Sequence, residues 1–279
     1  FLRSNSKAYV KKFMDIEKIK KSNLIEIHNR PDYINSIYEI NNNIVLYFHN
    51  NPLQMKLSKT VKDRIDIINK TKKIIFNSNW TLNNFMKGLN KKYNTDKLKV
   101  INQSTSKKII NFKNKKKIIL FVGRLNASKG YDLFGKAIIS VLNNNPDWKA
   151  IVIGDEPREN HIFEHKNLKI LGFQKYNAVT KWFVDSDISV VCSRWDEPFG
   201  RTALEASSAG CAVIITDKGG LSEASPKAMR IKSLTVKNVE NSIEKLIKNE
   251  SLKKSLQKRI YKHFYLTNNY ISKKIDRYR

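Results

Sequence analysis

The sequence is short of cysteine, of acidic residues and of long apolar runs. Only two cysteines occur among 279 residues, Cys192 and Cys211, and both stand in apolar surroundings. This number excludes a disulfide-stapled secreted domain and favours a reduced compartment, with both thiols packed in a core. No apolar run approaches the roughly 20 residues that a membrane-spanning helix needs. The chain opens with Phe-Leu-Arg-Ser-Asn-Ser-Lys, which is not a signal peptide.

The scarcity of acids leaves a formal net charge of +28, from 53 Lys and Arg against 25 Asp and Glu. Such an excess raises the possibility of nucleic-acid binding. The charge is spread evenly, however: residues 1–112 carry 22 basic against 8 acidic side chains, and the remainder carries 31 against 17. No zinc-knuckle spacing or aromatic–basic platform accompanies it. We therefore expect no nucleic-acid partner, whereas spread lysines remain compatible with an anionic membrane surface.

Apolar strand patterns alternate with helical patterns along the whole chain. The strands expected in the first half are 23–27, 43–48, 73–76 and 97–101, and a basic helix is expected over 7–21. In the second half, a strand pattern at 116–122 precedes a helical pattern at 131–142. Strands that alternate with helices predict parallel sheets covered by helices on both faces. Ligands of such sheets bind at the carboxyl ends of the strands, where His28, His49 and Ser78 stand in the first half.

A glycine turn with two cations follows the strand at 116–122. It reads Gly123-Arg124-Leu-Asn-Ala-Ser-Lys129-Gly130, and a helical pattern begins directly after it. A guanidinium can bind two phosphate oxygens at once, and an ammonium adds a point charge. The order strand, turn, cations and helix therefore predicts a site for a diphosphate. Taken alone, Arg124 and Lys129 are compatible with two solvated surface charges.

Two carboxylates lie eight residues apart across a Pro-Phe-Gly turn, in the run from Glu197 to Glu205. A buried-strand pattern at 187–193 precedes them, so we expect Glu197 at the tip of a strand and Glu205 two turns into a helix. Carboxylates accept hydrogen bonds from hydroxyls, and helix amino ends attract phosphate. This second motif predicts a ligand that carries both hydroxyls and anionic oxygens.

The two motifs together resemble glycosyltransferase family 4, the retaining nucleotide-sugar enzymes of the GT-B fold. The residues that carry the resemblance are Gly123-Arg124, Lys129-Gly130, Gly154-Asp155, Leu171-Gly172, Asp187, Ser193, Glu197-Pro-Phe-Gly200, Glu205-Ala206 and Gly219 to Glu223. They cover about residues 116–225 in the family's order. The resemblance implies an α/β protein with two Rossmann-like domains whose parallel sheets face a crevice.

The resemblance also implies roles for individual residues. Arg124, Lys129 and Glu197 are expected to be catalytic, together with His49, which matches the family's active-site histidine. Glu205 is expected to accept hydrogen bonds from the ribose, and Glu197 from the donor sugar. The full set expected to bind the donor is Gly123, Arg124, Lys129, Glu197, Phe199, Gly200, Arg201, Thr202 and Glu205. For His28, a role in shaping the crevice and a purely structural role stay open.

No metal and no cofactor is expected, because the GT-B enzymes generally bind diphosphate with cations and a helix end. The other histidines, His161, His165 and His263, lack partners at metal-ligand spacing. The expected reaction transfers a hexose or related sugar from a nucleotide diphosphate to a glycan or lipid-linked acceptor, as in the synthesis of cell-envelope polysaccharide. We expect a cytoplasmic enzyme that can contact the inner face of the membrane peripherally.

The expected domains are 1–112 on the acceptor side, 113–250 for the nucleotide sugar, and a terminal helix at 251–279 that crosses back. Compared with the family, the first domain is expected to be incomplete, because the usual opening strand and Gly-rich loop have no counterpart. Two alternatives remain: a sugar-nucleotide epimerase or hydrolase on the same scaffold, and a non-catalytic basic module that binds nucleic acid or membrane.

Overall fold

The computed structural model describes residues 5–159 and 161–278, and side chains from residue 8 onward within the first helix. The chain divides into two compact units, residues 1–102 and 103–279. The boundary expected from the sequence lies ten residues later. Backbone bonds explain the difference, because Thr105 N donates to Leu266 O at 3.1 Å and Lys108 N donates to Ser208 O at 3.0 Å. The polar segment 104–116 is therefore attached to the second unit.

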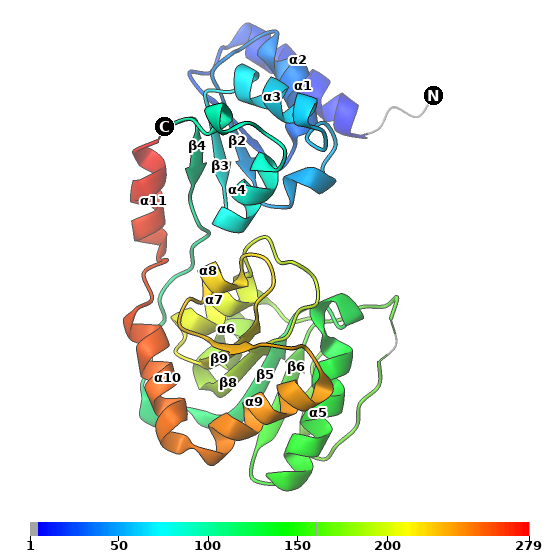
Figure 1. Ribbon diagram of the computed structural model, residues 1–279, viewed down its shortest axis with the longest axis vertical. Helices are drawn as coiled ribbons and strands as arrows, with labels where there is room; N and C mark the ends of the chain where they lie inside the picture. Colours follow the sequence, from blue (N-terminus) through cyan, green and yellow to red (C-terminus); the bar gives the residue numbers. More distant parts are fainter. Residues whose placement is uncertain (1–4, 160, 279) are drawn as a thin grey trace. The chain divides into compact units, whose positions relative to one another are not determined.

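The first unit is a four-stranded parallel sheet in the order β1-β2-β3-β4 (Figure 1). Its elements are α1 (Asn5–Ile19), β1 (Ile25–His28), η1 (Pro31–Tyr33), α2 (Ile34–Tyr38), β2 (Ile44–Phe48), η2 (Pro52–Gln54), α3 (Val61–Lys70), β3 (Lys73–Phe76), α4 (Asn79–Met86), η3 (Lys91–Tyr93) and β4 (Leu98–Val100). Because strand side chains alternate, every second residue enters the apolar core, which includes Ile25, Ile44, Phe48, Ile74 and Phe76.

The second unit is a six-stranded sheet in the order β10-β9-β8-β5-β6-β7, again with parallel neighbours. Its elements are η4 (Phe112–Asn114), β5 (Lys116–Val122), η5 (Ala127–Lys129), α5 (Tyr131–Asn144), β6 (Lys149–Ile153), β7 (Leu168–Ile170), α6 (Tyr176–Asp185), β8 (Ser186–Val191), α7 (Arg201–Ser208), β9 (Ala212–Thr216), α8 (Leu221–Ala224), β10 (Met229–Ile231), α9 (Val236–Lys248), α10 (Glu250–Lys262) and α11 (Asn268–Asp276). The strand order reverses direction at β5 and β8, which is where ligands of such sheets collect.

Both cysteines are free and buried in this unit, as the sequence indicated. Burial raises the pKa of the Cys192 thiol to about 12 and also raises the pKa of Cys211. A thiol that stays protonated is a poor nucleophile and a poor metal ligand, so both residues act as core side chains. None of the helices in the described part of the chain is long and apolar enough to cross a membrane.

A buried ion pair fixes α10 on the second sheet. The side chain of Lys253 is only 3% exposed, and its Nζ lies 2.8 Å from a carboxylate oxygen of Asp187 at the start of β8. Gln257 donates to the same carboxylate at 2.8 Å, and the ring of Trp148 lies 4.8 Å from the ammonium. A charge in such a place is tolerated because its partner and further hydrogen bonds replace the lost water.

Removing this ammonium is expected to destabilise the second unit. Lys253→Met leaves the Asp187 carboxylate buried without its cation, which costs about 3–5 kcal/mol in comparable pairs. Urea unfolding followed by tryptophan fluorescence measures the change. Lys254→Met is the matched control, because the Lys254 side chain is 60% exposed and pairs with the exposed Glu250, at 3.2 Å. Exposed pairs contribute about 0–1 kcal/mol, so equal losses in the two variants would contradict the argument.

Candidate functional site

The carboxyl end of β5 opens the candidate site of the second unit. Gly123 follows the strand, and its N–H donates to Ile153 O at the end of the neighbouring β6, at 3.0 Å. Gly154 follows β6 with φ 136°, and a Cβ there would lie 1.8 Å from Gly123 O. Only glycine allows the two strand ends to approach so closely. Arg124, next to Gly123, is exposed, and no ion pair holds its side chain in the described ranges.

A capped turn places Lys129. The side chain of Asn126 accepts a hydrogen bond from Lys129 N at 3.0 Å, which is the arrangement of an N-cap. Its Nδ2 donates to Glu156 at 3.3 Å, and Arg158 binds the same carboxylate through two bonds of 2.7 and 2.9 Å. The Arg158 guanidinium lowers the pKa of Glu156 to about 2, so this carboxylate stays ionised. Glu156 and Asn126 therefore brace the turn that carries the cation.

The end of β8 packs directly on this turn. Gly130 has φ 74°, and a Cβ there would lie 2.0 Å from Cys192 O. The carbonyl of Ser128 accepts bonds from Arg194 N at 2.9 Å, from Trp195 N at 3.0 Å and from the Ser193 hydroxyl at 3.1 Å. The two loops are thus joined along several residues, and this brings the second motif beside the first.

The two motifs meet in an ion pair. Lys129 Nζ lies 2.5 Å from Glu197 Oε1, and the ring of Trp195 lies 5.0 Å from the same ammonium. The backbone of Glu197 is held from the other side, because Gly220 N donates to its carbonyl at 2.6 Å. A Cβ at Gly219 would lie 2.1 Å from that carbonyl. Glu197 itself is 7% exposed, so its carboxylate is fixed rather than solvated.

The amino end of α7 completes the constellation. Gly200 caps the helix with φ 105°, and Phe199 before it is buried, so these two residues can act only through their backbone. Thr202 donates its hydroxyl to Val122 O at 3.3 Å, which fixes the helix end against the end of β5. Glu205 is paired with Arg201 at 2.9 Å. Since α7 begins at Arg201, Glu205 lies one turn into the helix, and the expected two turns are wrong.

The contacts described above hold eight of the nine residues expected to bind a donor near the carboxyl ends of the strands. Arg124, the ninth, directly follows Gly123 in the sequence. The sequence did not predict that Asn126 and Glu156 support the site, and it indicated Gly219 and Gly220 only as part of the resemblance, without a role. Asn126 had a usable signal, because asparagine directly before a helical turn is a common N-cap. The strand before Glu197 also ends earlier than expected, at Val191.

His49 lies in the first unit, directly after β2. Its Nε2 is 3.0 Å from Nδ1 of His28, and the sequence did not foresee this pairing. Asn29, with φ 60°, accepts a bond from His49 N at 3.1 Å, and Asn77 donates to His49 O at 2.9 Å. Burial lowers the pKa of His49, and the neighbouring His28 lowers it further, so His49 favours the neutral imidazole.

The remaining histidines have local partners: His161 lies 3.0 Å from Glu159, His165 lies 3.2 Å from Asn143, and His263 bonds to Arg259 O at 2.8 Å. Within the described ranges, no cluster of three or more His, Cys, Asp or Glu is arranged to hold a metal ion.

Comparison with known proteins identifies relatives of the chain in sequence and in fold. Curated relatives include the lipopolysaccharide core biosynthesis mannosyltransferase LpsB of Rhizobium meliloti, which is 35% identical over 111 residues, 36% of this chain and 31% of that protein. Spore coat protein SA of Bacillus subtilis is 30% identical over 118 residues, 37% of this chain and 30% of that protein. The matched segment thus spans about a third of the length of these relatives.

Solved structures share the fold over nearly the whole chain. A glycosyltransferase from Rickettsia africae superposes with a TM-score of 0.76 at 19% identity, covering 99% of this chain and 83% of that one. HepE from Anabaena, crystallised with UDP and glucose, superposes with a TM-score of 0.74 at 16% identity, covering 97% and 81%. These likenesses identify the GT-B fold. Because residues 102–263, more than half of the chain, match the family described as glycosyl transferases group 1, the protein belongs to that glycosyltransferase family.

Proposed function

We propose that the chain transfers a sugar from a nucleotide diphosphate donor to a glycan or lipid-linked acceptor and retains the anomeric configuration, as in glycosyltransferase family 4. The observation that carries the proposal is the Lys129–Glu197 pair at the strand ends, beside the amino end of α7. In this pair, Lys129 is the cation proposed to bind the diphosphate, and Glu197 is the carboxylate proposed to accept hydrogen bonds from the sugar hydroxyls. The UDP and glucose bound to HepE are consistent with such a ligand.

The proposed chemistry follows from this placement. The bond between the anomeric carbon and the diphosphate oxygen breaks, and its electron pair leaves with the diphosphate. Arg124, Lys129 and the α7 amides stabilise the growing charge, because preorganised donors act most strongly where charge develops. The acceptor oxygen bonds to the anomeric carbon on the face that the diphosphate leaves, and its proton passes to the leaving diphosphate. His49 is proposed to contact the donor sugar and to position the reaction centre.

Glu197 changes partner in this scheme. In the ligand-free site its carboxylate is neutralised by Lys129. When a donor binds, the ammonium turns to the diphosphate and the carboxylate accepts from the sugar hydroxyls. The charges of Lys129 and Glu197 are therefore paired both with and without the donor, which lowers the free-energy cost of the ligand-free state.

The direct test is a donor and acceptor assay. We propose to incubate the chain with a panel of nucleotide diphosphate sugars and with glycan and lipid-linked acceptors, with and without EDTA. Acceptor-dependent product with retained configuration supports the proposal. Donor binding that survives EDTA supports charge neutralisation by Arg124 and Lys129 without a metal. Free sugar or an epimer formed without any acceptor would instead identify the hydrolase or epimerase alternative.

The relatives suggest the biological setting. One is named for lipopolysaccharide core biosynthesis, and another for the cps region of Klebsiella pneumoniae. We propose cytoplasmic synthesis of cell-envelope polysaccharide, with peripheral contact at the inner face of the membrane. The exposed side chains of α1 support that contact, since Tyr9, Ile16 and Ile19 are 69%, 54% and 88% exposed beside several lysines.

The charge of Lys129 is expected to matter for diphosphate in particular. Lys129→Met removes one charge-assisted contact, of about 1.5–3 kcal/mol, so affinity for the nucleoside diphosphate should fall about 10- to 100-fold. Affinity for the monophosphate should change much less, and kcat should fall more than binding. Calorimetry and steady-state kinetics measure both. Lys116→Met is the control, because Lys116 lies at the opposite end of β5 and pairs with Asp185; equal effects of the two variants would refute the assignment.

Glu205 is expected to recognise the ribose through its carboxylate. Glu205→Gln should weaken binding of the nucleoside diphosphate about tenfold, and it should have little effect on a 2′,3′-dideoxy analogue that lacks the hydroxyls. Arg201→Ala is the matched variant, because it removes the partner of Glu205 but keeps the backbone amide at the start of α7. We expect Arg201→Ala to bind near the wild-type level. A loss for Glu205→Gln that is the same with both nucleotides would contradict the role.

The exposed face of α1 is expected to support membrane contact. Ile19→Glu should reduce binding to vesicles that contain anionic lipid, and binding should weaken with salt. Cosedimentation measures the bound fraction. Ile109→Glu is the control with the same change of charge, because Ile109 is 98% exposed in the second unit. If both substitutions reduce binding equally, net charge alone is responsible and α1 has no special part.

A further inference from the structure

His28 and His49 form a hydrogen-bonded pair of imidazoles at the ends of two neighbouring strands. Nδ1 of His28 lies 3.0 Å from Nε2 of His49, and the ring centroids are 5.3 Å apart with an interplanar angle of 5°. The register explains how they meet, since His28 is the Cα partner of Tyr47 and His49 follows Tyr47 by two residues. Both side chains therefore extend from the same face of the sheet.

The shared bond couples the tautomers of His28 and His49, because one of the two nitrogens must donate and the other must accept. A neutral imidazole has one donor and one acceptor nitrogen, so the shared bond makes the tautomer of each ring depend on the other. In the described part of the chain, Nδ1 of His49 is enclosed and meets no hydrogen-bond partner. The bond to His28 is thus the contact that decides which nitrogen of His49 carries the proton.

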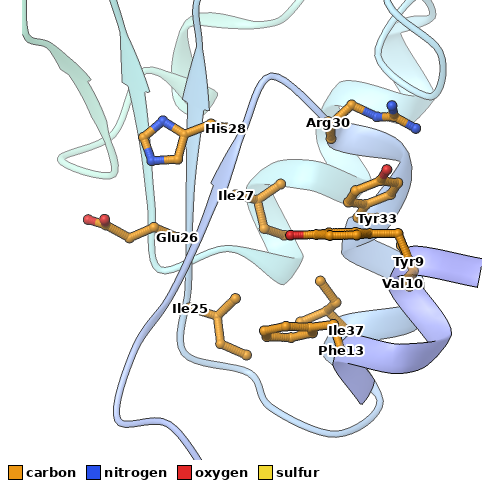
Figure 2. A pocket seen from close by; sticks show the side chains of 10 residues that line it. All are labelled: Tyr9, Val10, Phe13, Ile25, Glu26, Ile27, His28, Arg30, Tyr33 and Ile37. Carbon is orange, nitrogen blue, oxygen red and sulfur yellow. The ribbon is translucent and has the colours of Figure 1, made fainter. Parts of the chain in front are cut away.

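Contacts with Tyr47 and Glu26 determine the orientation of the His28 ring. Its ring stacks on Tyr47 with centroids 4.3 Å apart and an interplanar angle of 11°. The hydroxyl of Tyr47 in turn donates to Glu26 at 2.9 Å. Figure 2 shows Glu26 and His28 on one side of β1, while Ile25 and Ile27 extend to the other side, toward Phe13 and Ile37. The polar ladder of Glu26, Tyr47, His28 and His49 is therefore separate from the apolar packing of α1 and α2.

The backbone of His49 is fixed independently of His28. Asn29 and Asn77 bind its N–H and its carbonyl, as described above. Loss of the His28 nitrogen should therefore change the proton arrangement and the ring orientation of His49 without moving the loop. The effect of His28 on the His49 ring can therefore be measured separately from the effect of Asn29 and Asn77 on the His49 backbone.

We propose that His28 is a positioning residue for His49: its Nδ1 fixes the tautomer and ring orientation with which His49 meets the donor sugar. The proposal rests on the proposed role of His49 in sugar transfer. It requires the hydrogen-bonding nitrogen of His28, not merely a ring that stacks on Tyr47.

Two substitutions separate these features. His28→Phe keeps a ring against Tyr47 and removes the nitrogen, whereas His28→Asn removes the ring and keeps a hydrogen-bonding group near the position of Nδ1. We expect His28→Phe to lower kcat about tenfold or more with KM for the donor changed less than about twofold. We expect His28→Asn to stay within about threefold of wild type. His165→Phe is the control, because His165 lies in the second unit and its ring nitrogens bond to Asn143 and to the backbone N–H of Asn167.

The second measurement does not depend on activity. Nitrogen chemical shifts of ¹⁵N-labelled histidine report the tautomer of each of the five imidazoles. His49 should show one dominant tautomer in the wild type and in His28→Asn, and a changed tautomer population in His28→Phe. His165→Phe should leave the His49 signals unchanged.

The outcomes are distinct. Unchanged His49 shifts in a folded His28→Phe variant would overturn the proposal, as would equal losses of kcat in His28→Phe and His28→Asn. If the wild type transfers no sugar from any donor, the proposed function fails; a shift change confined to His28→Phe would then still establish that His28 sets the His49 tautomer.

Discussion

The close approach of two loops in the second unit determines the geometry of the candidate site. Gly130 stands where a Cβ would lie 2.0 Å from the carbonyl of Cys192, and the Ser128 carbonyl accepts three hydrogen bonds from residues 193–195. No side chain other than hydrogen fits at Gly130, so the contact is possible only with glycine. Because of it, two motifs that are nearly 70 residues apart in sequence place Lys129 and Glu197 within 2.5 Å.

The diphosphate site proposed for this unit raises an electrostatic problem. In the absence of a ligand, the cations of an anion-binding site repel one another and attract the nearest carboxylate. Here Lys129 is paired with Glu197 at 2.5 Å and Arg201 with Glu205 at 2.9 Å, so each of these cations has a carboxylate partner in the ligand-free site. In the proposed scheme, donor binding exchanges the partner of Lys129 and leaves no charge unpaired. Glu156 and Asn126 fix the backbone of the turn, so only the Lys129 side chain has to move.

The sequence was informative where a local pattern decides the structure. The strands at 73–76 and 116–122 have the expected bounds, because each contains an unbroken apolar run that directly follows lysine. The expected bounds were wrong where tertiary contacts determine the end of an element. β8 ends at Val191 and not at Ser193, because Cys192 and Ser193 turn away from the strand and contact Gly130 and Ser128. Likewise, the domain boundary expected after residue 112 lies after residue 102 in the structure, because residues 105 and 108 form backbone hydrogen bonds to distant segments of the second unit. The His28–His49 pair needed the register of β1 and β2, which no local pattern supplies.

Part of the positive charge that dominates the composition serves the fold rather than a partner. Arg64 is 2% exposed, and its guanidinium donates to the carbonyls of Ser58, Lys59 and Lys87 instead of facing a nucleic acid. Burial lowers its pKa. The Lys115 ammonium donates to the carbonyls of Phe183, Val184 and Ser186 at 3.2, 3.0 and 2.9 Å, at the carboxyl end of α6. A cation there satisfies carbonyls that the helix leaves unpaired and complements its dipole.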